Sequence, residues 1–220
     1  MQTHFDFFAN KIDNYRQEDF VFLPEYQEVK TYIEEFVKFK LFDFNPYKNL
    51  IINGQRCSGK THLLNIYANS HNLNFFNIKD LINKNPWHIF SANEFFVVDD
   101  FCLEEDEQKL LHLINCANES KSLLILLVRT NRKFRLADLN SRMENYKNIQ
   151  IAACNFQGLK QIFSHLMSRK QIEISPQILE YIFANITLSH QSIVETAKKI
   201  EFYINENSQK LSLKLIKEIL

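Results

Sequence analysis

The chain has 220 residues, with 26 Lys and Arg against 26 Asp and Glu, so its formal net charge is zero. This length can bury one core with a small appendage, and the neutral balance argues against strong direct DNA binding. Four cysteines without a CxxC pair exclude a zinc ribbon, and the aliphatic run Leu123–Val128 is too short to cross a membrane. Because the first residues include an acid and no basic stretch, we expect a cytoplasmic protein.

The apolar residues predict an amphipathic helix followed by alternating strands and helices. After Pro24, apolar side chains from Val29 to Val37 recur with the period of a helix. Strands are then expected at short apolar runs: 50–52, 75–76, 95–98, 123–128 and 149–153. Helices are expected between them, over 61–69 and 104–117. This alternation predicts an α/β fold, a parallel sheet between two helical layers.

After Gly158 the pattern changes to helices only, beginning with an apolar face over 159–167. Serines that can cap helix N-termini precede further helical segments: Ser175, Ser189 and Ser212. The chain is therefore expected to contain an N-terminal arm, an α/β subdomain and a helical lid subdomain: 1–17, 18–157 and 158–220.

The sequence Gly54-Gln-Arg-Cys-Ser-Gly-Lys-Thr61 matches G-x-x-x-x-G-K-[ST] between a predicted strand and a predicted helix. The backbone N–H groups of such a loop and the helix N-terminus bind phosphate oxygens. Lys60 would reach the β- and γ-phosphates, and the Thr61 hydroxyl would hold Mg²⁺. The motif predicts a site for ATP or ADP with Mg²⁺. Further residues assigned to it are Gly54, Cys57, Ser58, Gly59 and His62, although packing explains His62 more simply.

An acidic pair follows the strand expected at 95–98. Asp99 would contact the Mg²⁺, and Asp100 could orient an attacking water. Asn131, beyond the next strand, is a candidate to hydrogen-bond that water or the γ-phosphate, with Thr130 as the alternative. A surface turn would also explain the aspartates, and an ordinary loop would also explain the polar residues.

These motifs together resemble the AAA+ domain of the DnaA family. The resemblance rests on 54–64, on Asp99-Asp100 and on the box Asp138-Leu-Asn-Ser-Arg142, and it covers about residues 18–220. Within the family the chain is similar to the Hda type, which lacks the DNA-binding domain. The segment Glu18-Asp-Phe20 resembles the one that flanks the adenine, which assigns Phe20 to the nucleotide site.

The resemblance implies a regulator of the initiation of chromosomal replication. In the family, the arginine that Arg142 matches reaches the nucleotide on a neighbouring subunit, and Hda-type proteins thereby promote hydrolysis of ATP bound by DnaA. Proteins of this type also dock on the DNA polymerase sliding clamp through an N-terminal peptide. Residues of the arm are similar to that peptide: Gln2, Phe5, Phe7 and Phe8. DnaA and the clamp are thus the expected partners, and self-association is left open.

Gln191 departs from the family pattern, because it stands where the lid helix of the family carries an arginine that contacts the phosphates. The loss of this charged contact predicts stable ADP binding or weak intrinsic hydrolysis. Two other functions remain open, a helicase-loader-type adaptor and an interaction platform that hydrolyses nothing. Arg142 could instead be a surface residue paired with Asp138 or Glu144, and the arm could be a frayed terminus or pack its phenylalanines on the core.

Overall fold

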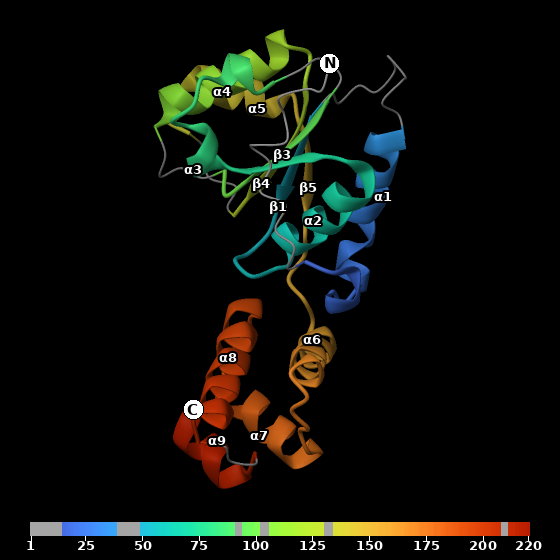
Figure 1. Ribbon diagram of the computed structural model, residues 1–220, viewed down its shortest axis with the longest axis vertical. Coiled ribbons are helices and arrows are strands. Elements are labelled where there is room, and N and C mark those ends of the chain that lie inside the picture. The colour runs from blue at the N-terminus through green and yellow to red at the C-terminus, as the bar shows by residue number, and fades with distance from the viewer. Residues whose placement is uncertain (1–14, 39–48, 91–93, 102–105, 130–133, 208–210) are drawn as a thin grey trace.

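The computed structural model describes residues 15–38, 49–90, 94–101, 106–129, 134–207 and 211–220. At its centre lies a parallel sheet with the order β2-β3-β4-β1-β5 (Figure 1). The strands are β1 (Leu50–Asn53), β2 (Asn74–Asn77), β3 (Phe95–Asp99), β4 (Leu123–Val128) and β5 (Lys147–Gln150). Because β3, β4 and β1 are neighbours, the segments that leave their carboxyl ends meet at one edge of the sheet. The predicted α/β class is confirmed.

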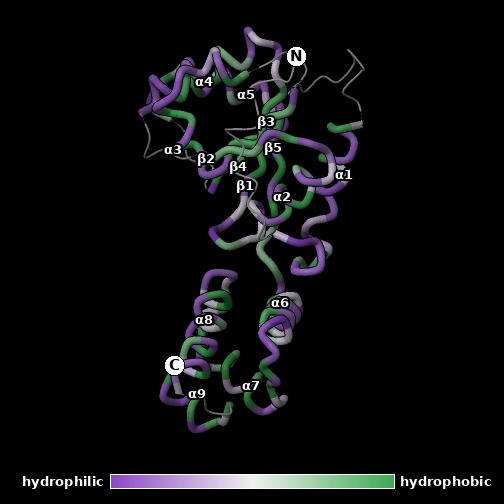
Figure 2. Tube along the Cα trace, viewed as in Figure 1, coloured by the Kyte–Doolittle hydropathy of each residue, from purple (hydrophilic) through white to green (hydrophobic). Residues whose placement is uncertain are grey.

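Helices cover both faces of this sheet. On one face lie α1 (Gln27–Lys38) and α2 (Lys60–His71), and on the other α3 (Ile78–Leu81), α4 (Glu107–Glu119) and α5 (Ala137–Glu144) (Figure 1). Successive strand residues alternate between the two cores, so that Leu50 and Ile52 join the first and Ile51 joins the second. Figure 2 shows hydrophobic residues along the strands and mixed hydropathy along the helices. The inner strands β1, β3 and β4 are almost continuously apolar because both of their faces are buried, whereas the edge strand β5 buries only Ile149.

The described C-terminal residues, 156–207 and 211–220, form four helices around a core of their own: α6 (Phe156–Arg169), α7 (Pro176–Asn185), α8 (His190–Asn207) and α9 (Leu213–Ile219). The predicted caps are confirmed, because the hydroxyls of Ser175, Ser189 and Ser212 each accept a hydrogen bond from the backbone N–H three residues on. None of the helices in the described ranges combines the length and apolar character that crossing a bilayer requires.

Several remaining segments form short 3-10 helices, at Gln17–Asp19, Pro24–Tyr26 and Pro86–His88. The strand expected over 149–153 lies earlier, at Lys147–Gln150, because its partner β1 ends at Asn53 and leaves later residues without a strand to pair with. The helix expected from residue 104 begins at Glu107. Helix α5 was not predicted, since Leu139 is its one buried residue and gives no helical period.

Gly158 lies in the first turn of α6, where an added Cβ would clash with Cys154 Sγ and stand 3.0 Å from Leu23 Cδ1. Alanine ordinarily stabilises a helix over glycine by about 1 kcal/mol. Here the crowding makes alanine less favourable than glycine. Gly158→Ala should therefore lower the free energy of unfolding by about 1–3 kcal/mol, measured by urea denaturation. In a Cys154→Ala background the loss should shrink. An alanine at 158 that stabilises the otherwise unchanged protein would contradict this packing.

Candidate functional site

The loop between β1 and α2 is held in a tight conformation by its own backbone. The Gly54 N–H donates to the Val128 carbonyl of β4 (3.2 Å), and the Ser58 N–H donates to the Gln55 carbonyl (3.2 Å). Cys57 and Gly59 both adopt positive φ, of 60° and 80°. At Gly59 a Cβ would also stand 3.0 Å from the Phe20 ring. Glycine at 59 therefore serves both the left-handed backbone and the close approach of Phe20.

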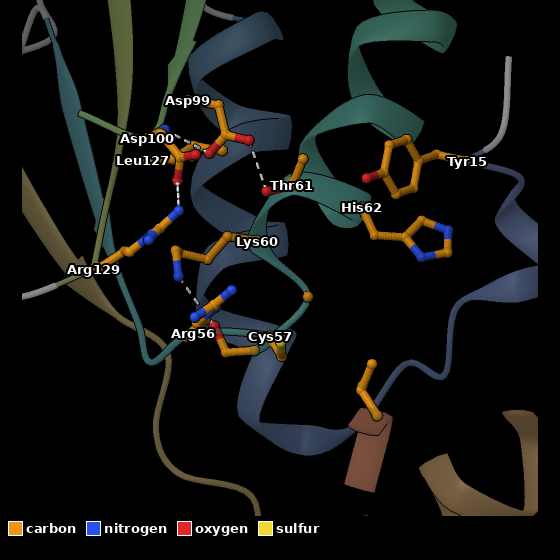
Figure 3. A pocket seen from close by; sticks show the side chains of 13 residues that line it. Tyr15, Arg56, Cys57, Lys60, Thr61, His62, Asp99, Asp100, Leu127 and Arg129 are labelled. Atoms are coloured by element: carbon orange, nitrogen blue, oxygen red, sulfur yellow. Dashed lines mark hydrogen bonds and ion pairs between the residues drawn. The ribbon is translucent and has the colours of Figure 1, made fainter. Parts of the chain in front are cut away.

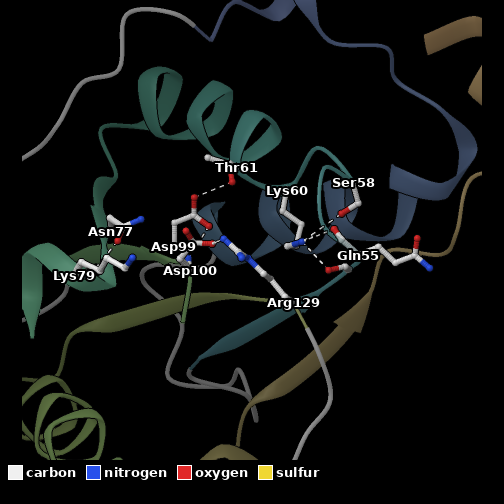
Figure 4. A network of polar contacts seen from close by, with 10 residues as sticks. Gln55, Ser58, Lys60, Thr61, Asn77, Lys79, Asp99, Asp100 and Arg129 are labelled. Atoms are coloured by element: carbon white, nitrogen blue, oxygen red, sulfur yellow. Dashed lines mark hydrogen bonds and ion pairs between the residues drawn. The ribbon is translucent and has the colours of Figure 1, made fainter. Parts of the chain in front are cut away.

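Lys60, the first residue of α2, places a buried ammonium group inside this loop. Its Nζ donates to the carbonyls of Gly54 (2.7 Å) and Gln55 (2.9 Å) and to Ser58 Oγ (3.3 Å) (Figure 4). The residue is 7% exposed. Burial lowers the pKa of Lys60 to about 8, and Asp99 opposes this shift. Since its bonding partners are neutral oxygens, the ammonium charge is available to an incoming anion.

Two carboxylates at the end of β3 face the first turn of α2. Thr61 Oγ1 donates to Asp99 Oδ2 (2.7 Å), and the Asp100 N–H donates to Asp99 Oδ1 (2.8 Å). Burial raises the pKa of Asp99, and these two hydrogen bonds oppose the increase. Asp100 has a φ of 55°, and its carboxylate forms an ion pair with Arg129, which follows β4 (Figure 3).

The Thr61 hydroxyl and the Asp99 carboxylate are a pair of hard oxygen ligands that fits Mg²⁺. Among the residues that the structure describes, no group of three or more His, Cys, Asp or Glu side chains could hold a metal. Mg²⁺ does not need one, because it is usually bound through one or two carboxylates, with waters and substrate phosphates as its other ligands. The donors present therefore suit a magnesium ion that arrives with a phosphate ligand.

These groups line one cavity of about 400 Å³, a volume typical of small-molecule sites, which span roughly 300–1,000 Å³. It lies where the carboxyl ends of β3, β4 and β1 meet, the usual ligand position in open parallel sheets. Eight of the residues predicted for the nucleotide and its metal contribute to the lining: Cys57, Ser58, Gly59, Lys60, Thr61, His62, Asp99 and Asp100.

Aromatic rings surround His62 on the side of the cavity away from Asp100 (Figure 3). The His62 ring centroid lies 5.0 Å from that of Tyr15 and 5.1 Å from that of Phe20. Its Nε2 forms a hydrogen bond with the Arg16 carbonyl (2.9 Å). His62 thus ties the segment at 15–20 to α2, and Phe20 contacts the loop at Gly59 without being part of the cavity lining.

Gln191 lies in the first turn of α8, but its side chain donates to Glu195 of the same helix (2.8 Å). It is not part of the cavity lining, to which α8 contributes Val194. Asn131 and the arm residues assigned to the clamp lie outside the described residues: Gln2, Phe5, Phe7 and Phe8.

Arg142 is exposed on α5 and lies outside the cavity of its own chain. Within the described part of the chain it forms no ion pair, including with its neighbours Asp138 and Glu144.

Five residues that line the cavity were not predicted from the sequence: Tyr15, Arg56, Leu127, Arg129 and Val194. The position of Arg129 could have been predicted, because this residue directly follows the apolar run of β4 and must therefore lie at the carboxyl edge of the sheet. Tyr15 could not have been predicted, since it belongs to a segment without apolar periodicity; in the structure its ring packs against His62.

No known protein family and no curated protein matches the sequence, but solved structures share its fold. Domain III of the replication initiation protein DnaA from Thermotoga maritima is 18% identical, with a TM-score of 0.68 over 94% of this chain and 95% of that domain. AMPPCP-bound DnaA from Aquifex aeolicus is 19% identical, with a TM-score of 0.63 over 92% of this chain and 70% of that one.

The RuvB Holliday junction branch migration motor of Thermotoga maritima is also similar, at 13% identity and a TM-score of 0.60 over 87% of this chain and 67% of that chain. The chain therefore shares its fold with domain III of DnaA, a parallel α/β sheet followed by a bundle of helices.

The buried ammonium of Lys60 makes stability depend on pH. Its pKa is about 8 in the folded state against 10.5 for an ordinary lysine, so the unfolded chain binds more protons between these values. The contribution of Lys60 to the free energy of unfolding therefore rises with pH. Relative to Lys60→Met, the protein in EDTA should gain up to about 3 kcal/mol in free energy of unfolding from pH 8 to pH 10.5, measured by urea denaturation at each pH. A difference that stays flat or falls would contradict the buried position of this charge.

Proposed function

We propose that the chain binds ATP or ADP with Mg²⁺ in the cavity at the loop 54–61. The observation that carries this proposal is the buried Lys60 ammonium, which stands among loop oxygens at the carboxyl edge of the sheet. Lys60 and the loop backbone would hold the phosphates, and Thr61 with Asp99 would hold the metal. Bound Mg²⁺ supplies positive charge against the phosphate oxygens.

The other side chains of the site have matching roles in this proposal. The aromatic segment that includes Phe20 would flank the adenine, since it packs against Gly59 at the loop. Asp100 and Asn131 would orient an attacking water. Gln191 brings no positive charge to the phosphates and is engaged with Glu195, which favours stable nucleotide binding with weak hydrolysis by this chain itself.

We further infer that the chain regulates the initiation of chromosomal replication by acting on ATP bound to DnaA. Arg142 supports this role, because it is exposed, lies outside its own cavity and forms no ion pair with a described residue. A guanidinium group supplied by a second molecule can neutralise charge that develops on a γ-phosphate. The arm at 2–8 would dock on the sliding clamp and bring Arg142 to DnaA on DNA.

A helicase-loader-type adaptor and a non-hydrolysing platform are the competing functions. An adaptor would bind nucleotide through the same loop but would need neither the clamp nor Arg142. A platform would keep the fold without a functional loop. Deletion of residues 1–10 should abolish clamp binding under the regulator function only, and loss of nucleotide in Lys60→Ala would exclude the platform.

The regulator function predicts that the chain accelerates hydrolysis of labelled ATP pre-bound to DnaA, in the presence of clamp-loaded DNA. Arg142→Ala should remove nearly all of this acceleration, because an arginine supplied in trans contributes about 10³–10⁵-fold to such reactions. The measurement is the rate at which the DnaA-bound label converts from ATP to ADP.

Arg135→Ala is the matched control, since it removes another exposed arginine close to α5 in the sequence and should leave the rate unchanged. Equal acceleration by Arg142→Ala and the unchanged protein would refute the role of Arg142. Failure of the unchanged protein to accelerate hydrolysis, with clamp binding demonstrated, would refute the regulator function and favour the adaptor.

A further inference from the structure

The orientation of the His62 imidazole is fixed by three contacts with the segment at 15–20. Its Nε2 forms a hydrogen bond with the Arg16 carbonyl (2.9 Å). The rings of Tyr15 and Phe20 pack against it at interplanar angles of 51° and 76°. A flip of the imidazole would replace Nε2 by a carbon atom and break the hydrogen bond. The ring therefore presents one defined edge to the cavity that it lines.

The hydrogen bond at Nε2 also determines which ring nitrogen carries the proton. A carbonyl oxygen only accepts, so Nε2 is the donor, and in the neutral ring Nδ1 is an acceptor. Within the described part of the chain Nδ1 forms no hydrogen bond, and it is not among the enclosed polar atoms that lack a partner. Figure 3 shows it on the side of the ring away from Tyr15. The cavity thus holds an accessible hydrogen-bond acceptor at His62.

This acceptor lies on the side of the cavity that suits the base of a nucleotide. Tyr15 and His62 line one side, Asp100 and Arg129 line the other, and Lys60 lies between them (Figure 3). With the phosphates at Lys60, the base has to extend toward one of these two sides. An aromatic base packs favourably against aromatic rings. The base would therefore lie beside His62, with its polar edge within reach of Nδ1.

We propose that His62 selects adenine among the purine bases, by accepting a hydrogen bond at Nδ1 from the amino group on C6. This inference rests on the proposed nucleotide binding at the loop 54–61. Adenine carries an N–H donor at this position, whereas guanine carries a carbonyl oxygen, which only accepts. Two acceptors that face each other leave both without a hydrogen bond, which costs free energy. A histidine that served packing alone would not distinguish these bases.

The test is calorimetric titration of the whole chain with three diphosphates that differ at C6 of the purine, each with Mg²⁺. ADP carries the amino group, purine riboside diphosphate carries a hydrogen atom, and IDP carries a carbonyl oxygen. Relative to ADP, the loss of one hydrogen bond should weaken the second ligand about threefold to tenfold. The facing acceptors should weaken IDP about tenfold to a hundredfold.

His62→Phe keeps an aromatic ring beside Tyr15 and Phe20 but removes Nδ1. It should weaken ADP about threefold to tenfold and change purine riboside diphosphate by less than about twofold, so that the preference for the amino group disappears. His88→Phe is the matched control, because it changes an exposed histidine outside the cavity, and it should keep the order of the unchanged protein. A role of His62 limited to holding the segment at 15–20 would instead weaken all three ligands together.

Equal affinity of the unchanged protein for the three diphosphates would overturn the inference and leave nucleotide binding intact, and this result does not depend on the folding of a variant. A preference for ADP that His62→Phe retains would also overturn it. If the unchanged protein binds none of the three ligands, the proposed function fails and this inference fails with it.

Discussion

The contact between the Lys60 ammonium and the carbonyls of its own loop is the interaction on which the site depends. It closes the segment between strand β1 and helix α2, and it keeps a positive charge in a nearly solvent-free position. Burying an ammonium with neutral partners costs free energy, which appears as the lowered pKa of Lys60. An anion that enters the loop would relieve this cost, so the buried ammonium favours the binding of phosphate.

The sheet order places the other charged groups around that ammonium. Asp99 and Asp100 leave β3, Arg129 leaves β4 and the loop leaves β1, and these strands are neighbours. Continuous burial of the strands on both faces holds their carboxyl ends in register. Polar groups that are distant in sequence thereby meet in one cavity. The helical bundle contributes Val194 to the lining of the same cavity.

Much of this arrangement was predictable from the sequence, for physical reasons that differ between elements. The functional residues of the loop 54–61 are contiguous in the sequence. The two aspartates follow β3, and the end of its apolar run marks the end of the strand. The serine caps were predictable because capping is local. Helix α5 and strand β5 were not predicted correctly, since α5 buries only Leu139 and β5 is an edge strand whose extent is set by β1. The pairing of Arg129 with Asp100 depends on sheet order, which no local pattern encodes.

The central claim is that the loop around Lys60 is a nucleotide site, and equilibrium binding of ADP with Mg²⁺ tests it most directly. The measurement is a calorimetric titration of the unchanged protein, of Lys60→Ala and of Lys109→Ala, the last being an exposed lysine on α4. The account predicts one saturable site per chain in the unchanged protein and in Lys109→Ala, and at least tenfold weaker binding in Lys60→Ala, about the loss expected for one charge-assisted contact. Equal affinity in all three proteins would contradict it.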